Sequence, residues 1–287
     1  MNQERVINPK EIIVKRLTLA VVVAVAFSIG AFANALAQTP ATVTPGEAKT
    51  ILMRMAEFIA KTQSVSVDVR DSYDVYQQSG QEIEFNEMRK ITMVRPDRFR
   101  VEVEESDGDK SVVLFDGKEL TMSSPSQNVY AKSPKPGSID DAVVYFVRDL
   151  GMKLPLSVLM QTTAPKELDQ RTQTLDYVEK TSIFGTPAHH LAGRTENVDY
   201  QLWIADGDRP LPLRLVLTYR KEKGQPQFRA QFSNWNLAPE VSSSLFEFVP
   251  PPGMQQIAFL AQLPRVAAQP AAKPVKPNKS KKSGDQK

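Results

Sequence analysis

The stretch SVSVDVRDSYDV at residues 64–75 decides the fold class, because apolar and polar residues alternate along it. Val65, Val67 and Val69 occupy every second position, with serine or aspartate between them. Side chains of a β-strand point to opposite faces in turn, so a period of two predicts a strand with one buried and one polar face. The same alternation returns along much of the chain.

Ten further stretches have the composition of strands. Five follow before residue 133 (83–93, 99–103, 112–115, 118–122 and 128–132), and five come later (174–183, 189–195, 199–205, 213–221 and 228–237). Asp116-Gly117 between two of them is a two-residue hairpin signal. Such short spacing is typical of antiparallel neighbours rather than of strand–helix–strand units. We therefore predict one mainly β domain of the α+β class, with about eleven strands.

Apolar residues at helical spacing predict an amphipathic helix over residues 45–62. A second helix is expected from Ser138, its N-cap, to about residue 149, and a short one over 154–160. A long antiparallel sheet with one apolar face curls into a barrel or half-barrel, and that face needs a cover. These helices can supply the cover. The interior is then either a plain packed core or an apolar concavity that can open to a ligand.

The first 37 residues have the pattern of an export signal. Lys15-Arg16 precede the apolar stretch LTLAVVVAVAFSIGAFA at residues 17–33, and Ala35-Leu36-Ala37 follows as an A-x-A cleavage site. We predict cleavage after Ala37 and a periplasmic location. An uncleaved inner-membrane anchor is the alternative, because the shortest spanning helices have roughly 17 residues.

The formal net charge of +3 combines three unlike segments: +2 in residues 1–37, +5 in 269–287, and −4 between them. A mildly acidic body argues against a nucleic-acid-binding domain, whose basic surface should lie on the fold itself. Residues 264–287, rich in proline and lysine, are expected to form a disordered basic tail. The tail is either a solubilising extension or a segment that attracts an anionic envelope surface.

The residue types of common catalytic and metal sites are scarce. The sequence has no cysteine, and a strand would turn the adjacent His189 and His190 to opposite faces, so no metal site is expected. Asp68, Asp71 and Asp74 are expected to be solvated charges rather than a catalytic pair. No serine-hydrolase, zinc-protease or phosphate-loop motif occurs. We expect no catalytic residues, no enzyme activity and no cofactor, and keep an envelope hydrolase only as an alternative.

Three motifs carry a resemblance to known families. They are VRPDRFR at residues 94–100, FDGKEL at 115–120 and FEFVPPPG at 246–253. In this order and at these distances they resemble motifs of the periplasmic lipoprotein carriers of the LolA/LolB type. The overall spacing is still more similar to a family of predicted periplasmic proteins termed domain of unknown function 2092. The resemblance covers roughly residues 45–258.

The resemblance implies a single open, LolA-like half-barrel over residues 38–263, with a helical lid above an apolar cavity that binds acyl chains. Arg95 matches the family arginine that holds the lid closed and is the candidate for lid gating, with an ordinary strand-end charge as the alternative. Trp203 either lines the cavity or packs in the core. The candidate cavity residues are Val65, Val67, Ile91, Met93, Phe99, Val101, Val113 and Trp203.

Two functional hypotheses follow. The first is a periplasmic, non-enzymatic carrier or chaperone that binds the acyl chains of a lipid or lipoprotein. The second is a protein-interaction or envelope-stress sensor module with the same fold, which the basic tail and the extended middle helices favour. The cargo and the oligomeric state stay open at this point.

Overall fold

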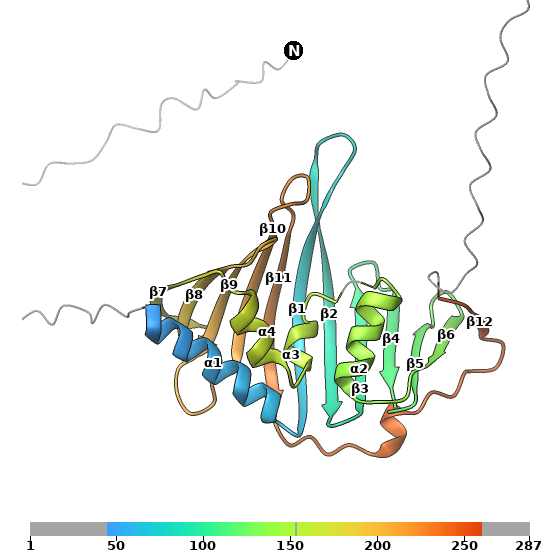
Figure 1. Cartoon of the computed structure of the whole chain (residues 1–287). Helices are drawn as coiled ribbons and strands as arrows, with labels where there is room; N and C mark the ends of the chain where they lie inside the picture. The colour runs from blue at the N-terminus through green and yellow to red at the C-terminus, as the bar shows by residue number, and fades with distance from the viewer. Residues whose placement is uncertain (1–44, 153, 260–287) are drawn as a thin grey trace, which may run out of the picture. The chain divides into compact units, whose positions relative to one another are not determined.

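This computed structural model describes residues 45–152 and 154–259 (Figure 1). The predicted signal peptide, its cleavage after Ala37 and the basic tail lie outside the described residues. Within the described part of the chain, no helix is long and apolar enough to cross a membrane.

The fold is built on one twelve-stranded sheet that does not close on itself (Figure 1). The strands are β1 (Ser64–Tyr76), β2 (Glu82–Val94), β3 (Arg98–Glu105), β4 (Lys110–Phe115), β5 (Glu119–Ser124), β6 (Val129–Pro134), β7 (Thr174–Ile183), β8 (Thr186–Arg194), β9 (Val198–Ala205), β10 (Pro212–Tyr219), β11 (Gln227–Asn236) and β12 (Gln255–Ile257). Their order is β12-β6-β5-β4-β3-β2-β1-β11-β10-β9-β8-β7. All neighbours are antiparallel except β12 and β6. The predicted open antiparallel sheet is confirmed, and the three-residue β12 is an addition that the sequence did not indicate.

Helices cover one face of this sheet (Figure 1). They are α1 (Pro45–Lys61), α2 (Ile139–Val144), the π-helix η1 (Tyr145–Asp149), α3 (Ser157–Met160) and α4 (Ala164–Arg171), and a 3-10 turn η2 (Ser243–Phe246) contacts β3. The amphipathic α1 packs on β7, β8 and β9 and also contacts α3 and α4. The predicted 154–160 helix is shorter than expected. The polar α4 was missed because its sequence, APKELDQR, has no apolar periodicity.

Ser138 caps the second helical segment as predicted. The backbone N–H of Asp141 donates to Oγ of Ser138 at 3.2 Å, and the Ser138 backbone N–H donates to Oδ2 of Asp141 at 2.9 Å. These reciprocal bonds form a capping box. Hydrogen bonds from the side chain and backbone of Ser138 lower the pKa of Asp141. The segment continues as η1 to Asp149, which matches the expected end.

The core lies between the helices and one face of the sheet. We call this face the covered face; it carries Val65, Val67 and Val69, all buried. The opposite face, which we call the outer face, carries the alternate residues of β1, including Asp68 and Arg70. Leu52 and Met55 of α1 and Val143 of α2 pack into the same core cluster as the covered face. Burial of apolar surface from both layers therefore holds the helices on the sheet.

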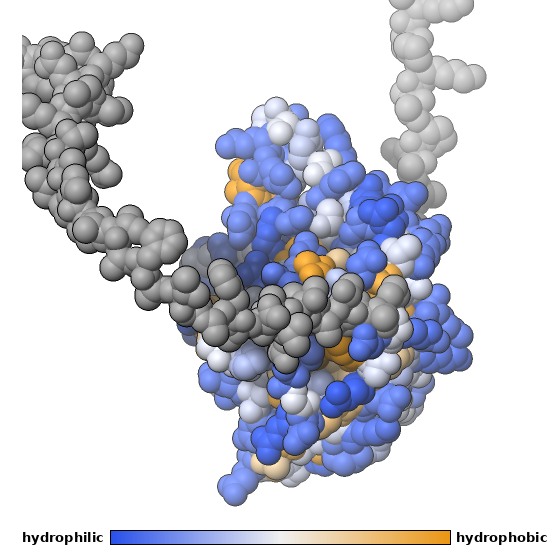
Figure 2. All heavy atoms as spheres, turned by 90° about the vertical axis from the view of Figure 1, so that its left-hand side faces the viewer, coloured by the Kyte–Doolittle hydropathy of each residue, from blue (hydrophilic) through white to orange (hydrophobic). Residues whose placement is uncertain are grey.

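β1 and β2 extend past their neighbours as a projecting hairpin (Figure 1). Val75, Ile83 and Phe85 near its tip are 37%, 38% and 40% exposed. Tyr73 and Phe85 stack on this hairpin with ring centroids 5.8 Å apart. The view in Figure 2 shows a mostly hydrophilic surface with small, separate hydrophobic areas. Apolar side chains on the hairpin are thus exposed, whereas those on the adjoining part of the covered face are buried.

Candidate functional site

A cavity of about 560 Å³ lies against the covered face. This volume is in the range of sites that hold small molecules. Its apolar wall consists of aromatic and aliphatic side chains from β1, β10, β11 and the segment between η1 and α3: Tyr73, Leu154, Pro155, Leu217, Tyr219 and Phe228. The cavity therefore has one wall from the sheet and one from the helical cover.

The register of three central strands builds the sheet side of this cavity. Tyr73 of β1 pairs with Phe228 of β11, and Phe228 pairs with Leu217 of β10. Side chains opposite each other in an antiparallel pair lie on the same face and close together. The three side chains therefore form one apolar row across the covered face, although Tyr73 and Phe228 are 155 residues apart in the sequence.

Charged residues adjoin this apolar row. Glu87 and Arg89 of β2 line the cavity, and Nε of Arg89 donates to Oδ1 of Asp71 at 2.8 Å. Arg89 also forms an ion pair with Glu87. Burial raises the pKa values of Asp71 and Glu87 above their usual range, while the nearby Arg89 acts in the opposite direction. An arginine shared by two carboxylates thus interrupts an otherwise apolar face.

The expectation for the three aspartates of β1 needs a correction. Asp68 and Asp74 do lie on the face opposite to Asp71, as the period of two requires. Asp71, however, is only 4% exposed and is not a solvated charge. The side chain of Asp74 is not solvated either, because it is 6% exposed and pairs with Arg229. Asp71 occupies a covered-face position between Val69 and Tyr73. The ion pair with Arg89 of the neighbouring strand offsets the cost of burying its charge.

Seven predicted cavity residues share the covered face with this site but do not line the cavity described above. They are Val65, Val67, Ile91, Met93, Phe99, Val101 and Val113, and each is at most 8% exposed. All seven belong to the buried core cluster. Their role in ligand binding stays a prediction.

Trp203 lies on the outer face, because its neighbours Leu202 and Ile204 occupy the covered face. Its ring stacks on His190 with centroids 4.0 Å apart. His189 points the other way, and its Nε2 is 3.0 Å from Oδ1 of Asp206. Among the described residues, no group of three or more ligand-type side chains could hold a metal ion.

Arg95 and the adjacent Pro96 join three parts of the fold. Its Nε donates to the carbonyl of Thr62, just after α1, at 3.1 Å. The adjacent Pro96 accepts a 2.8 Å hydrogen bond from the backbone N–H of Ile139 at the start of α2. Arg95 is 9% exposed, its two terminal nitrogens have no partner among the described residues, and burial lowers its pKa. The candidate for lid gating therefore lies at the junction of β2 with two covering helices.

Sequence reasoning missed the residues that line the cavity. Tyr73 and Phe228 were placed on strands, but nothing in their spacing showed that these strands pair. Leu154 and Pro155 were assigned to a short helix rather than to a cavity wall. The alternation of Tyr73 with polar residues was the one available signal, since it placed this ring on the apolar face.

Comparison with known proteins gives one family match. The model of a family described as "Predicted periplasmic protein (DUF2092)" matches residues 48–260, which is most of the chain. This description confirms the expected periplasmic location. No curated protein sequence matches the chain.

Solved structures with a similar fold are distant in sequence. The MucA/MucB complex of Pseudomonas aeruginosa is 19% identical, with 71% of this chain and 61% of that chain covered and a TM-score of 0.38. LprF of Mycobacterium bovis is 14% identical, with 70% and 97% covered and a TM-score of 0.41. A LolA superfamily protein of Nitrosomonas europaea is 12% identical, with 70% and 97% covered and a TM-score of 0.35. The likeness concerns the fold alone, and this chain spans about 61% of the MucA/MucB match.

Proposed function

The chain belongs to the DUF2092 family of predicted periplasmic proteins, and we propose that it binds the acyl chain of a lipid or lipoprotein on the covered face of its open sheet. In this proposal the protein is a carrier or chaperone and does not turn its ligand over. The single observation that carries the proposal is the cavity of about 560 Å³ between the sheet and its helical cover.

The cavity wall suits a flexible hydrocarbon chain. Leu217 and Phe228 supply apolar surface from the sheet, and Leu154 supplies it from the cover. Each buried methylene group stabilises a complex by about 0.8 kcal/mol. A chain of ~16 carbons gains on the order of 10 kcal/mol before the costs of association and of moving the cover. This gain is large enough to support a defined complex.

We further propose that the cover opens as the chain enters. The helices lie on the open sheet without closing its two edges, since β7 and β12 do not pair. Arg95 contacts the chain just after α1, and its neighbour Pro96 contacts the start of α2. The predicted gating role fits this position, because two consecutive residues, the Arg95 side chain and the Pro96 carbonyl, contact the two elements. Movement there would expose the seven buried core residues and lengthen the cavity.

A second candidate function, a protein-interaction or envelope-stress sensor module, is favoured by the projecting hairpin. Val75, Ile83 and Phe85 on this hairpin are exposed apolar residues of the kind that contact a partner protein. Co-purification of a stoichiometric protein without any lipid would support this function over the first. Attraction of the basic tail to an anionic envelope surface is a separate proposal, compatible with both.

The experiment that tests the carrier proposal is a chain-length series. Saturated fatty acids of about 8 to 18 carbons displace a fluorescent fatty acid from the purified protein, and affinity is expected to rise steadily with each methylene group. A dissociation constant that does not change with chain length would contradict acyl burial. Absence of binding at every length would reject the proposal.

A further inference from the structure

The cavity on the covered face has an acidic end, and we propose that it selects lipids whose polar head carries a positively charged amine. Glu87 of β2, which lines the cavity, is the residue that binds this head group. The inference rests on the proposed function, because it assigns the head group of the same ligand. Lipids with a carboxylate or phosphate head are then disfavoured.

Strand register places three carboxylates in one row beside the apolar row of the cavity. Asp71 of β1 pairs with Glu87, and Glu87 pairs with Glu105 of β3. Residues opposite each other in an antiparallel sheet share a face, so all three lie on the covered face. Tyr73 of the apolar row is two residues from Asp71 along β1. Like charges directly opposite each other destabilise a sheet, so pairing within the fold does not account for this acidic row.

One arginine is the only positively charged side chain among the described residues that line the cavity, and two carboxylates share it. Arg89 donates through Nε to Asp71 at 2.8 Å and also forms an ion pair with Glu87. Glu105 has no ion pair within the described part of the chain. Glu222, in the β10–β11 connection, adds another carboxylate to the cavity wall. Negative charge therefore exceeds positive charge around the cavity.

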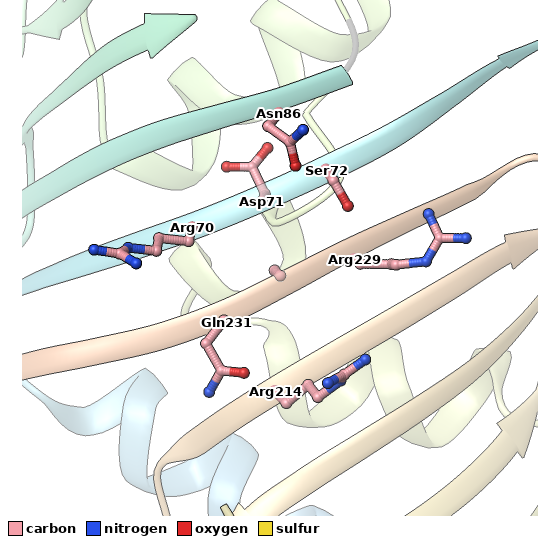
Figure 3. Close-up of a pocket in the computed structure, with 8 residues that line it drawn as sticks. Arg70, Asp71, Ser72, Asn86, Arg214, Arg229 and Gln231 are labelled. Atoms are coloured by element: carbon pink, nitrogen blue, oxygen red, sulfur yellow. The ribbon is translucent and has the colours of Figure 1, made fainter. Parts of the chain in front are cut away.

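Asp71 leaves one acceptor of the acidic row unused. Its side chain is 0% exposed, and its Oδ2 has no hydrogen-bond partner among the described residues. Figure 3 shows this carboxylate between β1 and β2, with the guanidinium groups of Arg70 and Arg214 extending away from it. These two arginines of the outer face therefore do not neutralise the row. A buried acceptor without a donor is costly, so a donor supplied by a ligand would stabilise this end of the cavity.

The pKa of Glu87 agrees with a surplus of negative charge. Burial raises this pKa most, Arg89 lowers it, and Asp71 and Glu105 raise it further. The hydroxyl group of Tyr73 is affected in the same way, since burial and then Glu87 and Glu105 raise its pKa. These carboxylates therefore favour a cation at this end of the cavity and repel an anion.

A primary ammonium group fits the acidic end better than other common head groups do. It is a compact charge with three N–H donors, so it can pair with Glu87 and also donate to a neighbouring oxygen. A hydroxyl group has one donor and no charge. A carboxylate or a phosphate adds further negative charge beside Glu87. The hydrocarbon chain of the same ligand then lies along the apolar row of Tyr73, Phe228 and Leu217.

The test keeps the chain constant and changes the head group. Dodecylamine, dodecanol and dodecanoate, each with ~12 carbons, displace a fluorescent fatty acid from the purified exported protein at about pH 7. Glu87→Gln removes the charge and leaves Arg89 paired with Asp71, whereas Glu87→Asp keeps the charge. Glu84→Gln is the matched control, because Glu84 is an exposed residue of the same strand that pairs with Asp74 on the outer face. All variants keep the basic tail, so its charge is constant.

We expect the wild type to bind dodecylamine about tenfold more tightly than dodecanoate, with dodecanol between them. Glu87→Gln should bring the dissociation constants of the amine and the carboxylate close together, while Glu87→Asp and Glu84→Gln keep most of the difference. Equal affinity of the wild type for the three probes, or an unchanged preference in Glu87→Gln, would overturn this inference and leave acyl binding standing. Displacement by none of the three probes would reject the proposed function, and this inference with it.

Discussion

Nε of Arg89 on β2 donates to Oδ1 of Asp71 on β1 at 2.8 Å, which places an ion pair on the covered face of the sheet. The second oxygen of Asp71 is buried without a partner among the described residues. Burial raises the pKa of this carboxyl group although the arginine opposes the shift. Removing one partner of such a pair is costly, so the pair limits which changes this face tolerates.

The raised pKa predicts how Asp71 affects stability at different pH. A group whose pKa is raised in the folded state stabilises the fold fully below its unfolded value, here 3.8, and this contribution is lost as the pH rises through the folded value. The wild type should therefore be more stable relative to Asp71→Asn at about pH 3.5 than at about pH 7, which means that its free energy of unfolding exceeds that of the variant by more at the lower pH. Urea denaturation at both pH values measures it.

Asp141→Asn is a matched control with the opposite sign. Its pKa is lowered by hydrogen bonds from Ser138, so its contribution is present above the unfolded value and is lost as the pH falls through the folded value. The stability of the wild type relative to Asp141→Asn should then be greater at about pH 7 than at about pH 3.5. Two profiles of the same sign would show that the environment of Asp71 is not as described.

Leu217→Trp is expected to fill the acyl cavity. Leu217 is a partly buried residue in the cavity wall, and the indole ring of a tryptophan at this position occupies the space that the ligand needs. The affinity for a fatty acid of ~16 carbons should fall about tenfold or more. Thr218→Trp is the control, because Thr218 lies on the outer face of the same strand. Equal affinity in both variants would place acyl binding elsewhere.

Arg95→Met tests the proposed gating role. The change removes the 3.1 Å bond to Thr62 and also a buried charge with two unpartnered nitrogens. These effects oppose each other, so the free energy of unfolding should change by less than about 2 kcal/mol. Exchange of bound fatty acid, followed by stopped-flow fluorescence, should become faster. Unchanged exchange rates in a stable Arg95→Met protein would leave Arg95 as an ordinary strand-end residue.

Gly193→Ala is expected to destabilise the contact between β9 and the end of α4. A methyl group on Gly193 would overlap the ring of Tyr200, its cross-strand partner. The hydroxyl groups of Tyr200 and Thr172 are 2.8 Å apart, so displacement of the ring also disturbs the residue that follows α4. We expect a loss of about 1–3 kcal/mol in thermal or urea unfolding. Ala192→Ser, one residue away on the outer face, should change stability much less.

Local patterns predicted most of the fold. The alternation in residues 64–75 placed Asp71 on the face opposite to Asp68 and Asp74, and the structure agrees. Ser138 followed by two aspartates located the start of α2. The same reasoning failed for α4, which is polar around most of its surface, and for the short edge strand β12. Both form through tertiary contacts rather than through a strong local preference.

The candidate site was harder to predict because it depends on register between distant strands. Tyr73 and Phe228 meet only after β1 pairs with β11, and no local signal specifies that pairing. Burial of Asp71 depends in the same way on Arg89 from the next strand. The outer-face position of Trp203 could have been predicted, since Leu202 and Ile204 on either side are apolar.

Native mass spectrometry followed by lipid extraction tests the central proposal most directly. The wild-type protein and Leu217→Trp are isolated from the periplasm without detergent and measured side by side. The proposed acyl binding predicts a bound lipid of defined mass on the wild type and much less on Leu217→Trp. A wild-type protein that carries no lipid, or equal lipid on both proteins, would contradict acyl binding in this cavity.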